Sequence, residues 1–196
     1  MAMKIIELVL TDDEDSIGVE AVSVVNSPAI EIDFVALSKM KYTFAEVDTE
    51  KRILLGPALI PNKQIYREDD TNGQYYIWFS SDTIKQASEL FFKNHNQSNA
   101  TFEHTKNIKG MTVVESWIIE DTEKDKSSLY GFSLPKGTWM LSMKVDNDEV
   151  WEQVKGGTIK GFSIEGYFAD KLSLNKIKTK VLESVKDLLN NYFNAK

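Results

Sequence analysis

Three stretches of this chain alternate apolar residues with other residues at a period of two, which is the pattern of half-buried β-strands. They read GTWMLSMKV, TVVESWIIED and TIKGFSIEGYF. Four further strand candidates are QYYIWFSS, KRILLG, KIIELVL and FEHT. Strands and helices do not alternate regularly, so a doubly wound parallel sheet is disfavoured. We expect an α+β fold with a largely antiparallel sheet or barrel and a few helices.

Three stretches carry helical patterns. SDTIKQASELFFKN opens with Ser81 or Asp82 as a cap, and DNDEVWEQVKGG has a capping-box-like start. LSLNKIKTKVLESVKDLLNNYFNAK repeats apolar residues at helical spacing and contains no glycine or proline. We therefore expect a β-rich domain over residues 1–170, followed by an amphipathic C-terminal helix over residues 171–196.

Composition excludes several classes of function. The 196 residues include no cysteine, which excludes a disulfide scaffold, a thiol nucleophile and cysteine-ligated metal. The N-terminal stretch does not have the pattern of a signal peptide, and no apolar run approaches membrane-spanning length. The formal net charge is -7 without a basic cluster, so duplex nucleic acid is not an expected partner.

Ser163 stands in the middle of a predicted strand, on the face away from Phe162 and Ile164. The segment GFSIE misses the G-x-S-x-G nucleophile elbow by one residue, because Glu165 replaces the second glycine. The strand–turn–helix context of that elbow is also missing, so an α/β-hydrolase is rejected. Taken alone, a serine in this setting is more often an ordinary strand residue.

The chain has two histidines, so any mechanism that uses imidazole must use His95 or His104. His95 follows a predicted helix in a polar loop, where a solvated role is favoured. His104 lies in FEHT, where it can be a packed strand residue or a catalytic base. A zinc site would need His104 plus carboxylates only, without an HExxH motif, and is disfavoured.

Glu115 lies among apolar residues of its predicted strand, where a carboxylate needs a partner or shifts its pKa. If KNIKGM closes a hairpin, Glu115 falls almost opposite His104, within cross-strand reach. A carboxylate that orients an imidazole is the third element of a serine-nucleophile site. The alternative is a strand-edge glutamate in water.

Four stretches in order resemble the prohead (procapsid maturation) serine proteases of tailed phages, which are relatives of the herpesvirus assembly protease. They are SVVNSPAIEIDFVALSK, RILLGPALIPNKQIYR, FEHTKNIKGMTVVESWIIED and GTWMLSMKVDNDEVWEQVKGGTIKGFSIEGYF. The resemblance covers most of residues 19–168. It implies a compact, mainly antiparallel β-barrel flanked by helices, with Ser163 as nucleophile and His104 as base.

The resemblance also bears on the third catalytic residue. The herpesvirus enzymes use a second histidine after the serine, and this chain has none after Ser163. Phage relatives use an acidic residue, for which Glu115 is the first candidate and Asp121 and Glu120 are the others.

The resemblance further implies a serine endopeptidase that works inside the procapsid, in the cytoplasm of the bacterial host. Its substrates would be the scaffold or the scaffolding segment of the capsid protein, and often the protease itself. Self-association is compatible with this role, and no cofactor or metal is implied. One alternative is a non-enzymatic virion assembly protein that reuses the barrel, with Ser163 and His104 far apart. Another is a small-ligand-binding β-barrel with an apolar pocket and no imidazole near Ser163.

Overall fold

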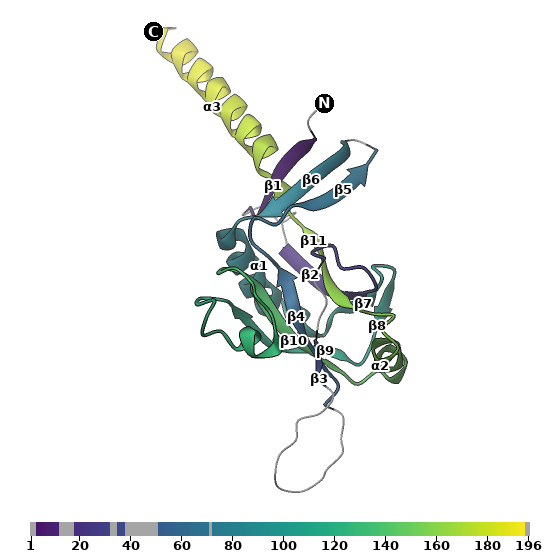
Figure 1. Ribbon diagram of the computed structural model, residues 1–196. Coiled ribbons are helices and arrows are strands. Elements are labelled where there is room, and N and C mark those ends of the chain that lie inside the picture. The colour runs from purple at the N-terminus through teal and green to yellow at the C-terminus, as the bar shows by residue number, and fades with distance from the viewer. Residues whose placement is uncertain (1–2, 12–17, 32–34, 38–50, 71, 195–196) are drawn as a thin grey trace, which may run out of the picture.

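The computed structural model describes residues 3–11, 18–31, 35–37, 51–70 and 72–194. This part of the chain forms three four-stranded sheets and three α-helices (Figure 1). The mixed α+β class expected from the alternating segments is therefore confirmed.

The sheets are built from strands that are far apart in sequence. The first has the order β12 (Ala169–Asp170), β1 (Lys4–Val9), β6 (Gly73–Phe79), β5 (Ile65–Asp69). The second has the order β3 (Val35–Leu37), β4 (Ile53–Leu59), β10 (Trp139–Val145), β9 (Met111–Ile118). The third has the order β11 (Gly161–Tyr167), β2 (Gly18–Val25), β7 (Ala100–Phe102), β8 (Lys106–Ile108).

The expected closed barrel is not found among the described residues. Most pairings are antiparallel, but β1 with β6 and β2 with β7 are parallel. Strands β4 and β11 approach each other without pairing, so the second and third sheets remain separate. A register shift between Glu165 and Gly166 interrupts the regular ladder of β11. A herpesvirus-protease-like fold therefore stays a prediction.

Helix α1 (Ser81–Lys93) packs its apolar face against the core beside β2, β9 and β10. The ring of Phe91 meets Trp139 edge to face, with centroids 5.6 Å apart, and both residues are fully buried. The N-cap is Ser80, whose side chain accepts a hydrogen bond from the Thr83 amide, so the predicted cap at Ser81 or Asp82 was wrong by at least one residue. Helix α2 (Asp148–Lys155) buries Trp151 and is capped by Asn147.

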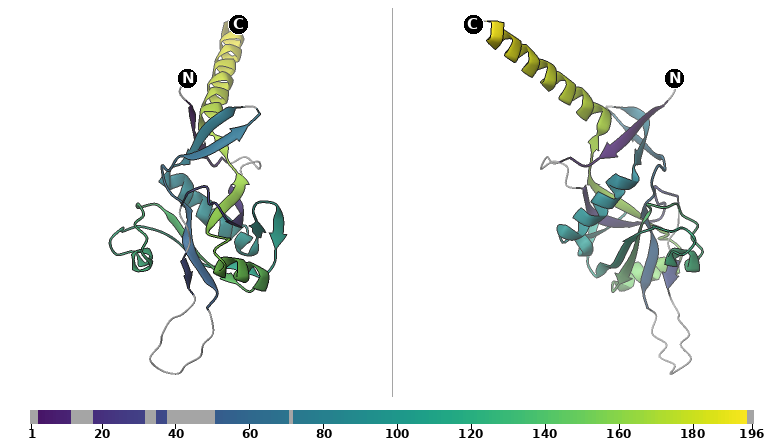
Figure 2. Two further views of the ribbon diagram at one scale, coloured as in Figure 1. Left: turned by 45° about the vertical axis from the view of Figure 1, so that its right-hand side comes forward. Right: turned by 90° about the vertical axis from the view of Figure 1, so that its left-hand side faces the viewer.

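Helix α3 (Lys171–Asn194) follows β12 directly and projects away from the sheets (Figures 1 and 2). Four of its large apolar side chains are about half exposed: Ile177, Val181, Leu182 and Val185. The predicted C-terminal helix is thus present, while its status as a domain apart from residues 1–170 stays a prediction. None of the described helices is long and apolar enough to cross a membrane.

Candidate active site

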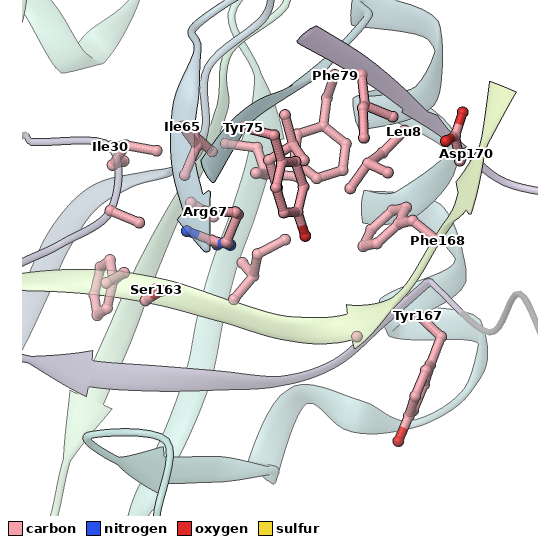
Figure 3. A pocket seen from close by; sticks show the side chains of 18 of the residues that line it. Leu8, Ile30, Ile65, Arg67, Tyr75, Phe79, Ser163, Tyr167, Phe168 and Asp170 are labelled. Atoms are coloured by element: carbon pink, nitrogen blue, oxygen red, sulfur yellow. The ribbon is translucent and has the colours of Figure 1, made fainter. Parts of the chain in front are cut away.

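Ser163 lies on β11 directly opposite Ser23 of β2, in an antiparallel pair. Cross-strand partners point to the same face of a sheet, so the two serines are neighbours on one face. Ser163 is 7% exposed and lines two adjoining hollows, and Figure 3 shows it on β11 at the floor of the first. The serine is therefore nearly buried in its strand but borders open space.

His104 stands in the turn between β7 and β8 and not in a strand as expected. Glu103 and His104 both have left-handed backbones, with φ of 48° and 57°. Consecutive non-glycine residues in this region store backbone strain, which persists only where surrounding contacts hold it.

Strand β2 and Asn26, the residue that follows it, provide those contacts. The His104 amide donates to the Ser23 hydroxyl at 3.1 Å, and the Glu103 amide donates to the Val24 carbonyl at 3.2 Å. The Asn26 amide donates to the Glu103 carboxylate at 2.7 Å. Because β2 pairs with β11 on its other edge, one strand positions both Ser163 and His104.

The carboxylate beside His104 belongs to Glu165. Its Oε1 lies 3.1 Å from Nδ1 of His104 and also accepts a hydrogen bond from the Thr101 hydroxyl. Glu165 stands two residues after Ser163 on the same strand, and therefore on the same face. With the proton of neutral His104 on Nδ1 and shared with Glu165, Nε2 is free to accept a proton.

The predicted hairpin that would bring Glu115 to His104 is wrong. Strand β9, which carries Glu115, pairs with β10, and β7 pairs with β8 instead. Glu115 accepts a hydrogen bond from the Ser142 hydroxyl at 2.6 Å and forms an ion pair with Lys126 at 3.0 Å. The hydrogen bond from Ser142, together with Lys126, lowers the pKa of Glu115 against the opposing effect of burial.

The two alternative acids also have partners of their own after β9. Asp121 accepts hydrogen bonds from the amides of Glu123 and Lys124, and Glu120 forms an ion pair with Lys136. The structure thus gives all three predicted acids contacts other than His104, whereas sequence reasoning did not consider Glu165 for this role.

Two hollows meet at Ser163. A mainly apolar cavity of about 380 Å³ lies between β11 and the sheet that contains β5 and β6 (Figure 3). A more open cleft of about 620 Å³ is lined by Ser163, His104 and Glu165 together. Within the described ranges, no group of three or more histidine or acidic side chains could hold a metal ion. A serine-nucleophile site uses a hydroxyl, an imidazole and a carboxylate, and Ser163, His104 and Glu165 line one cleft here.

Comparison with known families agrees with this class. The model of the family described as "Putative phage serine protease XkdF" matches residues 41–172, about two thirds of the chain. The chain belongs to this family.

A second comparison, with individual proteins, gives a partial match. Over 103 residues, which are 52% of this chain, the sequence is 31% identical to the "Uncharacterized protein YqbD" of Bacillus subtilis (strain 168). The matched region spans only 30% of that relative's length. No solved structure matches the chain.

Proposed function

We propose that this chain is a serine endopeptidase of the phage procapsid, with Ser163 as nucleophile, His104 as general base and Glu165 as the orienting acid. The observation that carries the proposal is the shared cleft, in which His104 is held by Glu165 on the face that also bears Ser163. Family membership supports the protease class. The substrates would be the scaffold or the scaffolding segment of the capsid protein.

The chemistry follows from these roles. Nε2 of His104 takes the hydroxyl proton as Oγ of Ser163 attacks the peptide carbonyl carbon. The same proton then passes to the leaving amine, the tetrahedral intermediate collapses, and an acyl-enzyme remains. In the second step His104 takes a proton from water, which attacks the acyl-enzyme, and returns that proton to Oγ of Ser163. Glu165 keeps the productive tautomer and stabilises the imidazolium that forms.

The non-enzymatic alternatives fit this site less well. A virion protein that merely reuses the fold has no need to place Ser163 and His104 in one cleft. A small-ligand-binding protein accounts for the apolar cavity, but not for an imidazole held by a carboxylate beside it.

The test is co-expression with the scaffold and capsid proteins of the same phage, followed by mass spectrometry of all peptides. We expect cleavages that disappear in Ser163→Ala and in His104→Ala, each variant losing about 10⁶-fold in kcat because triad members act as a unit. Ser88→Ala and His95→Ala are the matched controls. The Ser88 hydroxyl donates to the Lys85 carbonyl within α1, and His95 lies just after that helix. Cleavage that persists in Ser163→Ala would refute the proposal.

A further inference from the structure

Arg67 lies where the cavity and the cleft meet. It belongs to β5, the edge strand of its sheet, and its side chain is half-buried. Arg67, Ser163 and Ile164 line both hollows. Figure 3 shows Arg67 reaching from β5 toward the strand that carries Ser163. Its guanidinium therefore borders the space that a substrate on Ser163 would fill.

Arg67 forms no ion pair within the described part of the chain, although Glu20, Glu103 and Glu165 line the same cleft. Its guanidinium donates to the Tyr66 carbonyl at 2.9 Å, and no carboxylate contacts it there. Asp170, the acidic residue that lines the cavity, is engaged by Lys4 and Ser173. Burial lowers the pKa of Arg67, which reflects the cost of keeping a cation away from water. An anion in the cavity would offset that cost.

Most of the other residues that line the cavity are apolar, with Asn72, Tyr75 and Asp170 among the polar exceptions. Its walls include Leu8, Ile30, Ile65, Ile77, Phe79 and Phe168. An entering group must therefore be apolar along its length and negatively charged where it meets Arg67. Among amino acids, the glutamate side chain has this character, and aspartate is one methylene shorter.

We infer that Arg67 determines specificity by binding the carboxylate of a glutamate side chain that the substrate places in the cavity beside Ser163. This inference rests on the proposed function. An arginine–carboxylate contact is charge-assisted and geometrically selective, so it discriminates glutamate from its uncharged isostere glutamine.

The first experiment maps cleavage sites. A library of natural peptides is digested with wild type, with Arg67→Met and with Lys136→Met as a control cation in the Glu120 ion pair. We expect glutamate to be enriched by about 10- to 100-fold over glutamine at one position next to the cut bond, as a charged hydrogen bond permits. Arg67→Met should lose this enrichment and still cut neutral sites, while Lys136→Met keeps it. Enrichment that survives in Arg67→Met would overturn the inference.

The second experiment measures peptide binding to a protein that cannot cleave the peptide. The Ser163→Ala protein is titrated with the amidated peptides acetyl-Ala-Glu-Ala and acetyl-Ala-Gln-Ala, and with acetyl-Ala-Gln-Ala carrying a free C-terminal carboxylate. NMR shifts report Kd, and Arg67→Met and Lys136→Met are each made in the same Ser163→Ala background. We expect at least about tenfold tighter binding of the glutamate peptide, lost in Arg67→Met. Equal binding of the two amidated peptides, or tightest binding of the free C-terminus, would overturn the inference. Because no cleavage is needed, this result is independent of whether the proposed protease activity is found.

Discussion

The backbone amide of His104 is hydrogen-bonded to the hydroxyl of Ser23, which is the cross-strand partner of Ser163. Ser23 is fully buried, and its hydroxyl also lies 3.4 Å from the Thr101 carbonyl, to which it donates. The candidate base is thus fixed through its main chain by the neighbour of the candidate nucleophile.

We predict that Ser23→Ala lowers kcat by about 10- to 100-fold with a smaller change in KM, because a small displacement of His104 is enough to weaken proton transfer. The variant should also exchange the His104 amide proton faster, which NMR can follow. Ser88→Ala, another buried serine, is the control. A kcat within about twofold of that control would show that Ser23 does not position the base.

Glu165→Gln should lower kcat by about 10³- to 10⁴-fold, because glutamine keeps the shape but no longer stabilises the imidazolium or selects its tautomer. Steady-state kinetics on a substrate cut by wild type would measure the loss. A folded Glu165→Gln variant with wild-type kcat would leave a Ser163–His104 dyad as the mechanism.

Glu115→Gln should leave kcat within about threefold of wild type, because Glu115 contacts Ser142 and Lys126. We expect Glu115→Gln to change the pH dependence of the free energy of unfolding instead. The pKa of Glu115 is lowered in the fold, so its stabilisation is present above the ordinary carboxyl pKa and is lost as pH falls through the folded value. Urea unfolding should therefore show a difference between wild type and variant that shrinks on acidification. A large loss of kcat would instead return the acid role to Glu115.

Gly166→Ala should destabilise the fold by about 3 kcal/mol or more, because an added Cβ would overlap the Gly18 carbonyl oxygen and lie 2.8 Å from Cα of Val19. Gly73→Ala is the control, since its positive φ is strained but nothing lies within 4 Å of the added atom. We expect that control to cost only about 1 kcal/mol. Chemical unfolding that gives equal losses for the two variants would contradict this account of β11.

Incubation of purified wild type should shorten the chain at its C-terminal end, whereas Ser163→Ala stays intact. The start of α3 carries Lys176, Lys178 and Lys180, all exposed, so a second molecule can reach it. Intact-mass spectrometry measures the change. A full-length wild type, in a preparation shown to cut the scaffold or capsid substrate, would argue against self-processing under those conditions.

Local pattern predicted β1, β4, β6, β9, β10 and β11, because alternation is a property of neighbouring residues, but FEHT lies mostly in a turn and β2 was not predicted. TIKGFSIEGYF contains β11, and the same period of two already placed Glu165 on the face of Ser163. The sequence therefore placed Glu165 beside Ser163, but not beside His104, whose position depends on the pairing of β7 with β2.

Pairing could not be predicted in the same way. The turn at Glu103 and His104 uses left-handed backbones without glycine, so nothing in FEHTKN marks it as a turn. Gly110 does mark a turn, but it joins β8 and β9, which lie in different sheets. Which strands pair, and whether sheets close, depends on contacts between distant segments.

The candidate chemistry and the candidate recognition lie on different sheets. Ser163, His104 and Glu165 all depend on the sheet β11-β2-β7-β8, whereas Arg67 belongs to the sheet β12-β1-β6-β5. Substitutions in the β5–β6 hairpin can therefore alter which peptide is accepted without disturbing the proton transfer. In such an enzyme, selectivity can diverge between related phages while the rate of bond cleavage is inherited unchanged.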